Sequence, residues 1–266
     1  MTRNDLLDFA GRVVVVTGGA SGMGAATARE FARRGAGVMI VDMNETGSRS
    51  VADECRAILQ QVGAAHAHVS MQIGDVGDSG FCDGVIDHTV SEFGSVDVLA
   101  NAAGTIHRAD SFGTTDADWR RVMRVNVDGM FFLCRAALRP MTAAGRGAIV
   151  NFGSIWGGVG SAGSTAYCVS KGAVHQLTRA LALDHVEQGV RVNAVAPGEV
   201  NTPMLASQRS APPSPDDLQA LADATIPMKR LAEPEEIARV VVFLASDDAS
   251  YMTGEIVHVD AGYTAR

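Results

Sequence analysis

Short apolar runs, rich in β-branched residues, alternate with longer helical stretches along the whole chain. A run that is apolar on both faces, such as residues 12–17, is typical of a strand buried in a parallel sheet. The expected strands are 12–17, 38–42, 66–71, 96–101, 147–152, 190–195 and 256–260. The expected helices are 22–35, 45–62, 79–93, 115–143, 164–187, 215–224 and 234–245. This alternation predicts an α/β fold: a doubly wound parallel sheet of about seven strands with helices on both faces.

The 266 residues, 47% of them hydrophobic, supply enough apolar surface for one domain spanning 1–266, and no repeat or linker interrupts the chain before residue 200. The net charge of −8 argues against nucleic acid or an anionic membrane as a partner. The apolar runs have the length of strands, and the first residues lack a signal-peptide pattern, so we expect a cytoplasmic protein. The four cysteines have no metal-binding spacing, and no metal is expected.

A glycine-rich turn, T-G-G-A-S-G-M-G, occupies residues 17–24 between the first strand and the first helix. Glycines let the chain turn sharply and let a pyrophosphate approach the backbone, while the helix N-terminus supplies N–H groups. This context predicts a dinucleotide site. Its expected contacts are Gly18, Ser21, Gly22, Met23 and Gly24.

Asp42 ends the second strand, eighteen residues after Gly24. A carboxylate here accepts the ribose hydroxyls of adenosine and repels a 2′-phosphate, and neighbouring Met43 offers no positive charge, so NAD is the expected cofactor. Met43 is itself an expected cofactor contact, and further contacts are expected where the next strands end: Asp75 and Val76 near the adenine, and Asn101 and Gly104 near the ribose. A helix-capping role is the alternative for Asp75.

Tyr167 and Lys171 are four residues apart on a predicted helix, so both project from one face. An ammonium group there should stabilise the tyrosine phenolate and lower the pKa of Tyr167 from its ordinary value of about 10. Ser154, from a nearby strand end, would hold the oxygen of a carbonyl or alcohol. Together these residues predict a proton-transfer site.

These motifs together resemble the short-chain dehydrogenase/reductase family, which has a Rossmann fold, and the resemblance covers essentially the whole chain. It is carried by T-G-x-x-x-G-x-G at 17–24, N-x-A-G at 101–104, Asn126 in R-V-N-V-D-G, Ser154, Y-x-x-x-K at 167–171 and P-G-x-V-x-T-P at 197–203. The chain departs from the family at Ala102, often an asparagine, and at Ala261, commonly a glycine.

The resemblance implies roles for individual residues. Tyr167 would be the general acid/base, and Lys171 would lower its pKa and bind the nicotinamide ribose. Asn126 would hold a helix distortion and a water that completes a proton relay. The nicotinamide would be bordered by Pro197, Gly198, Val200 and Thr202. By analogy the family also implies a homotetramer.

In this family the substrate is selected by the segment after residue 154, the loop near 105–110 and the lid after Pro203. Ile155, Trp156 and Met204, with Leu205, would form an apolar wall suited to a ring or a short chain. His107 and Arg108 are interpreted as solvated loop residues, with contact to a polar substituent as the alternative. A substrate lid is expected near 203–225, mobile and rich in proline, and its Arg209 is a candidate for binding a carboxylate.

We therefore expect an oxidoreductase that transfers hydride between NAD(H) and a small-molecule secondary alcohol or ketone. A 3-oxoacyl thioester (acyl-carrier-protein) reductase shares every motif and remains an alternative. A non-catalytic NAD-binding regulator is a second one, although such proteins usually lose the tyrosine or the lysine. A dehydratase or epimerase that recycles its NAD usually has a longer chain.

Overall fold

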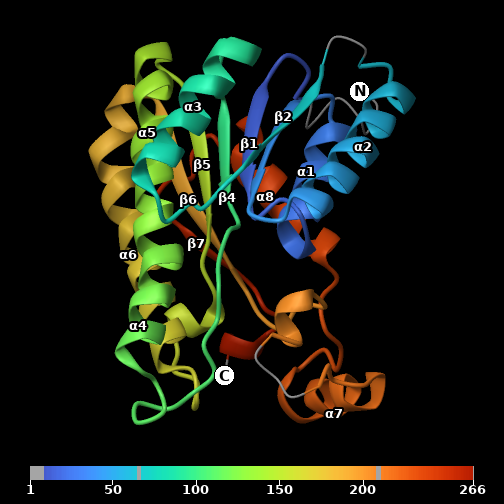
Figure 1. Cartoon of the computed structure of the whole chain (residues 1–266), viewed down its shortest axis with the longest axis vertical. Coiled ribbons are helices and arrows are strands. Elements are labelled where there is room, and N and C mark those ends of the chain that lie inside the picture. Colours follow the sequence, from blue (N-terminus) through green and yellow to red (C-terminus); the bar gives the residue numbers. More distant parts are fainter. Residues whose placement is uncertain (1–8, 65–66, 208–210, 266) are drawn as a thin grey trace.

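All strands in the described part of the chain run parallel and form one seven-stranded sheet, in the order β3-β2-β1-β4-β5-β6-β7 (Figure 1). The computed structural model describes residues 9–64, 67–207 and 211–265. The strands are β1 (Val13–Thr17), β2 (Gly37–Asp42), β3 (Val69–Ile73), β4 (Val98–Asn101), β5 (Gly147–Phe152), β6 (Val190–Pro197) and β7 (Ile256–Val259). This confirms the predicted doubly wound sheet.

The helices follow the strands in the predicted alternation. They are α1 (Gly22–Arg33), α2 (Glu45–Gln61), α3 (Ser79–Phe93), α4 (Asp116–Met123), α5 (Gly129–Ala144), α6 (Thr165–His185), α7 (Pro215–Thr225) and α8 (Pro234–Ala245). The single helix expected over 115–143 is instead α4 and α5 joined by a π-helical turn, Arg124–Asp128. The third strand begins at Val69, later than predicted, and residues 65–66 lie outside the described ones.

Two apolar layers cover the sheet. On one face α1, α2 and α8 pack through residues such as Phe31, Val51 and Val241. On the other, α3, α5 and α6 pack through residues such as Leu133 and Val174 (Figure 1). Because both faces are covered, the central strands are buried at nearly every position, which explains their continuous apolar sequence. No helix among the described residues is long and apolar enough to cross a membrane.

The chain reverses its direction across the sheet between β1 and β4. After β3 it returns to the other side of β1, so β1 lies between β2 and β4. The two strand ends stay joined there, since Ala103 N donates a hydrogen bond of 3.1 Å to Thr17 Oγ1. In doubly wound folds ligands bind in the crevice at such a switch point, beyond the carboxyl ends of the strands.

The segment expected to form a lid begins with a short 3-10 turn, Pro203–Leu205, and ends with α7. In Figure 1, α7 stands apart from the layers that cover the sheet, beyond the carboxyl ends of the strands. Its start is well defined: the Ser214 side chain accepts from Asp217 N, and the Asp217 carboxylate accepts from Ser214 N. Arg209 lies outside the described residues. The mobility of the segment stays a prediction.

Candidate active site

The glycine-rich turn leaves no room for side chains at two of its positions. Gly18 has φ +63°, and a Cβ there would lie 2.8 Å from Ala103 N. A Cβ on Gly24 would lie 2.1 Å from Gly18 O. The glycines therefore let β1 turn directly into α1, and they leave the first turn of that helix accessible to a ligand.

A cavity of about 650 Å³ opens along this turn. Asp42 lines it from the end of β2, where its carboxylate accepts hydrogen bonds from Ala20 N (3.1 Å) and Asn44 N (2.9 Å). The described residues that line the cavity include no lysine or arginine. They are Gly18, Ser21, Gly22, Met23, Gly24, Asp42, Ala102, Gly104, Thr202, Pro203 and Met204. The glycine-rich turn and the fixed Asp42 carboxylate fit a dinucleotide cofactor.

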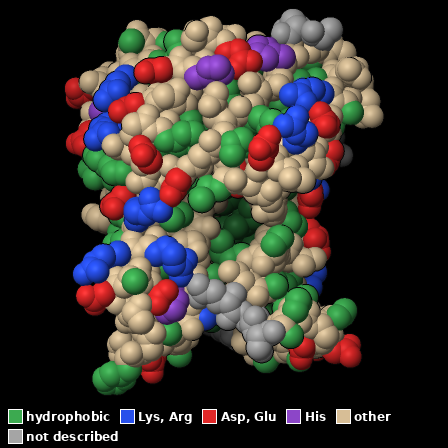
Figure 2. Space-filling model, viewed as in Figure 1, with side chains coloured by type: hydrophobic (Ala, Val, Ile, Leu, Met, Phe, Trp, Pro, Cys, Tyr) green, Lys and Arg blue, Asp and Glu red, His purple; other side chains and the backbone are tan. Residues whose placement is uncertain are grey.

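A second cavity, of about 530 Å³, adjoins the first and shares Met23, Thr202 and Met204 with it. Figure 2 shows a hollow on the viewed face that is lined largely by hydrophobic side chains. The residues around the second cavity include Tyr167 and Ser154, with Gly153, Ile106, Arg108, Ile155, Trp156, Pro197, Gly198, Glu199, Val200 and Leu205. Many of the predicted cofactor and substrate residues therefore line two adjoining cavities.

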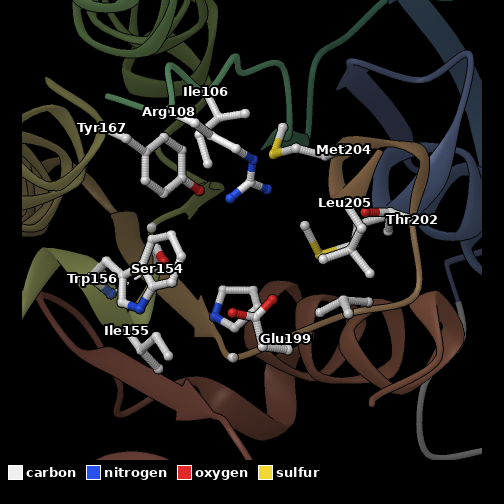
Figure 3. A pocket seen from close by; sticks show the side chains of 15 residues that line it. Ile106, Arg108, Ser154, Ile155, Trp156, Tyr167, Glu199, Thr202, Met204 and Leu205 are labelled. Carbon is white, nitrogen blue, oxygen red and sulfur yellow. Dashed lines mark hydrogen bonds between the residues drawn. The ribbon is translucent and has the colours of Figure 1, made fainter. Parts of the chain in front are cut away.

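Tyr167 lies in the first turn of α6, 8% exposed, with its hydroxyl directed into the second cavity (Figure 3). Ser154, at the end of β5, hydrogen-bonds this hydroxyl, and its Oγ also accepts from Trp156 N at 3.2 Å. The Trp156 ring stands edge-on to the Tyr167 ring, with centroids 6.0 Å apart. The phenol is thus fixed by one hydroxyl and one aromatic ring.

Lys171 lies one turn further along α6 and is also buried. Its ammonium donates a hydrogen bond of 2.6 Å to Phe152 O and lies 5.6 Å from the centroid of the Tyr167 ring. The predicted spacing therefore does place both side chains on one helix face.

The expected effect on the tyrosine pKa is wrong for this arrangement. Burial raises the pKa of Tyr167 to about 12, although the hydrogen bond from Ser154 acts in the opposite direction. Burial also lowers the pKa of Lys171 to about 8. Loss of hydration disfavours the charged form of each group, and here it outweighs the stabilisation expected from a lysine one turn away.

Asn126 lies in the π-helical turn between α4 and α5 and is fully buried. Its side chain pairs with the Thr105 backbone, and its Nδ2 also donates to Ser170 Oγ at 2.9 Å. Ser170 in turn donates to Tyr167 O at 2.8 Å. The helix distortion expected at Asn126 is present, and it ties the loop after β4 to the helix that carries Tyr167.

Besides Lys171, four predicted cofactor residues line neither cavity. Asn101 is buried and donates to Asn151 Oδ1 at 3.1 Å, across the β4–β5 pair. Val76 is buried against α5 and lines neither of the two cavities. Asp75 accepts from Gly77 N and pairs with Arg124 at 2.6 Å; the helix-capping alternative is wrong, because Asp78 is the N-cap of α3. Met43, beside Asp42, is exposed.

The substrate wall contains more residues than the sequence indicated. Ile155, Trp156, Met204 and Leu205 line the second cavity as expected, and Ile106 joins them. The solvated-loop interpretation is wrong for two residues. Arg108 lines the cavity, and the His107 side chain is 14% exposed, with Nδ1 3.6 Å from Asp118.

Glu199 also lines the cavity and was missed. It occupies the variable position of the P-G-x-V motif, between glycine and valine, and this position was the available signal.

Known proteins are similar to this chain over nearly its whole length. Residues 18–264 match a protein-family model described as enoyl-(acyl carrier protein) reductase. The chain is 45% identical to cis-4-hydroxycyclohexanecarboxylate dehydrogenase of Sinomonas cyclohexanicum over 97% of this chain and 98% of that protein. It is 44% identical to galactitol 2-dehydrogenase (L-tagatose-forming) of Cereibacter sphaeroides, over 96% and 95%.

Among solved structures, a short-chain type dehydrogenase/reductase from Mycobacterium marinum superposes with a TM-score of 0.89 at 30% identity, covering 98% of this chain and 99% of that one. A family match over most of the chain, two dehydrogenase relatives and this superposition all lead to one assignment. The chain belongs to the short-chain dehydrogenase/reductase family and is an oxidoreductase that acts on CH–OH groups with a nicotinamide cofactor.

Proposed function

We propose that the protein is an NAD-dependent dehydrogenase that interconverts a secondary alcohol and its ketone, with Tyr167 as the general acid/base. One observation carries this proposal. The Tyr167 and Ser154 hydroxyls meet at the wall of a cavity that shares Met23, Thr202 and Met204 with the groove along the glycine-rich turn. An alcohol in this second cavity would therefore be adjacent to a cofactor in the groove along the glycine-rich turn. When bound, NAD would accept the hydride from the carbinol carbon.

The chain's own residues would handle the proton and the substrate oxygen. Ser154 would hold the oxygen in line with the Tyr167 hydroxyl, which would take or give the proton. Lys171 would stabilise the phenolate and bind the nicotinamide ribose. Asn126 would hold the loop after β4 and the proton-relay water in place. Pro197, Gly198, Val200 and Thr202, which line the second cavity, would border the nicotinamide.

The preference for NAD over NADP rests on Asp42. Backbone N–H groups of Ala20 and Asn44 fix its carboxylate at the edge of the groove. A 2′-phosphate would meet this negative charge without a cation among the described lining residues to offset it. We further propose a cytoplasmic homotetramer, by analogy with the family.

The test is formation of NADH at 340 nm with purified protein, a panel of cyclic, acyclic and sugar alcohols, and either NAD or NADP. Activity with NAD on secondary alcohols is expected, and Tyr167→Phe should lower kcat by about 10²- to 10⁴-fold because the proton relay is lost. Tyr251→Phe is the matched control, since Tyr251 is fully exposed and should leave kcat unchanged. Near-normal turnover by Tyr167→Phe would overturn the mechanism.

A thioester reductase is the second candidate, favoured by the description of the matching family model. A carrier protein is acidic and needs a basic docking surface, whereas this chain carries a net charge of −8. Acetoacetyl and crotonyl thioesters with NADH and NADPH belong in the same panel. Faster turnover of either thioester than of any alcohol would favour this second function.

A further inference from the structure

Two side chains of opposite charge face each other across a pocket that is otherwise mostly apolar. Arg108 enters from the loop after β4, and Glu199 enters from the segment after β6. In Figure 3 the guanidinium of Arg108 points toward the middle of the cavity, beside the Tyr167 hydroxyl, and the Glu199 carboxylate approaches from the opposite side. Nothing in hydride transfer itself requires either charge, so they point to the substrate.

Arg108 is held in position at both ends. Its backbone follows Thr105, which Asn126 clamps through two hydrogen bonds of 2.8 Å. Its Nε donates to Ser207 O at 3.3 Å, so the side chain also contacts the beginning of the expected lid. The guanidinium group is planar and rigid, and it matches a carboxylate through two parallel hydrogen bonds. A guanidinium fixed in this way can select a substrate by the position of its anionic group.

We propose that the substrate is a secondary alcohol on an apolar ring or chain that also carries a carboxylate, which Arg108 binds. Glu199 orients this substrate by repelling the carboxylate from the opposite wall. The proposal rests on the proposed function and names its substrate class. One end of the molecule is held by Arg108, so its hydroxyl reaches Tyr167 and Ser154 in a single orientation.

The remaining lining argues against a polyol. Ile106, Ile155, Trp156, Met204 and Leu205 present carbon surface to the cavity. Each hydroxyl placed against such a wall loses its bonds to water without gaining a partner, which is costly. A carboxylate on a hydrocarbon frame instead places one polar group at Arg108 and buries the rest. Glu199 adds discrimination, because the reversed orientation brings two negative charges together.

The experiment compares three NAD-linked oxidations by the full-length protein: cis-4-hydroxycyclohexanecarboxylate, the uncharged cis-4-methylcyclohexanol, and galactitol. The wild type should have its highest kcat/KM with the carboxylate. Arg108→Gln should lower that value about 10- to 100-fold, mostly through KM, because a charge-assisted pair is lost. The loss with cis-4-methylcyclohexanol should be several times smaller, and Arg108→Lys should recover part of the carboxylate activity. Glu199→Gln should lower KM for the carboxylate.

Arg139→Gln is the matched control, since Arg139 is on the outer surface of α5, paired with Asp83. It should leave all three oxidations unchanged. Melting temperatures of the variants separate misfolding from lost recognition. Equal losses by Arg108→Gln on charged and uncharged alcohols would overturn the proposal, as would a wild-type preference for galactitol that Glu199→Gln abolishes. A wild type that oxidises uncharged alcohols and shows no preference for the carboxylate refutes only this inference. A wild type inactive on every alcohol with both cofactors refutes the proposed function.

Discussion

Asn126 pairs with Thr105 as if it were the backbone of a neighbouring strand. Thr105 N donates to Asn126 Oδ1 and Asn126 Nδ2 donates to Thr105 O, both at 2.8 Å. Asn126 belongs to a helix, yet its side chain satisfies the backbone N–H and C=O groups of Thr105. Thr105 lies in the loop that carries Gly104 on one side and Arg108 on the other. A single amide therefore aligns the cofactor groove with the substrate pocket.

Asn126→Ala should consequently damage both stability and turnover. Loss of the buried partners of Thr105 should lower the free energy of unfolding by about 1–3 kcal/mol. The displaced loop should lower kcat roughly tenfold or more, because catalysis depends on positions held within about 1 Å. Urea unfolding and initial rates measure the two effects.

Asn193→Ala is the matched control. Asn193 is equally buried, and it donates to Met252 O at 2.8 Å and accepts from Glu255 N at 3.0 Å, away from both cavities. It should lose comparable stability and keep its kcat. If both variants kept kcat, Asn126 would have only a structural role.

The buried ammonium of Lys171 predicts a pH-dependent stability. Burial lowers its pKa to about 8, below its ordinary value of 10.5, so the unfolded chain binds more protons between these two values. Stability should therefore rise as the pH increases from 8 to 10.5, and it should level off at its lowest value below pH 8. The pKa of Tyr167, raised by burial to about 12, contributes its own change only above pH 10.

Lys171→Met removes this dependence. The free energy of unfolding of the variant minus that of the wild type should be largest below pH 8 and should decrease toward pH 10. Urea midpoints at pH 7, 8, 9 and 10 measure it. Lys229→Met changes the exposed lysine after α7 and should show no such trend. A constant difference for Lys171→Met across this range would mean that Lys171 keeps its ordinary pKa.

Asp42 should determine the choice of cofactor. Asp42→Ser removes the charge that would face a 2′-phosphate and the acceptor for the ribose hydroxyls. The ratio of kcat/KM for NADP to that for NAD should rise about 10- to 100-fold, since a hydrogen bond to a charged group is lost and a repulsion is relieved. Parallel assays with both cofactors provide the measurement. An unchanged ratio would assign the preference to another residue.

Ala261 occupies a backbone conformation that suits glycine. Its φ is +55°, in the left-handed region, at the position where the family commonly has glycine. Ala261→Gly should stabilise the protein by up to about 1 kcal/mol, because the strain of the Cβ outweighs the added freedom of the unfolded chain. Gly84 is the opposite case: it lies exposed within α3, and a Cβ there would meet nothing within 4 Å. Gly84→Ala should also stabilise, and thermal unfolding of both variants checks the pair.

The sequence predicted most strongly what depends on spacing along one element. Alternation of apolar runs predicted the parallel sheet, and a separation of four residues placed Tyr167 and Lys171 on one helix face. The glycine-rich turn was recognisable because it has a strand before it and a helix after it.

Properties that arise only from packing were harder to predict from the sequence. The pKa of Tyr167 depends on burial by distant segments, and the sequence does not report it. Asn101 was expected near the ribose, but the register of β4 against β5 turns its amide toward Asn151. Arg108 and Glu199 are ninety-one residues apart in numbering, and only the parallel sheet brings them to opposite walls of one cavity.

The π-helical turn at Arg124–Asp128 has a consequence for which chain lengths this region tolerates. Such a turn amounts to one residue inserted into an α-helix. Removing one residue there would let α4 and α5 join as a regular helix, but everything on one side of the cut would rotate by about 100° relative to the other. Either Asn126 would lose its hydrogen bonds to Thr105, or the apolar face of α5 would no longer pack against the sheet. The segment between the buried residues Val122 and Met130 should therefore not tolerate insertions or deletions. Single substitutions at its exposed positions should be tolerated.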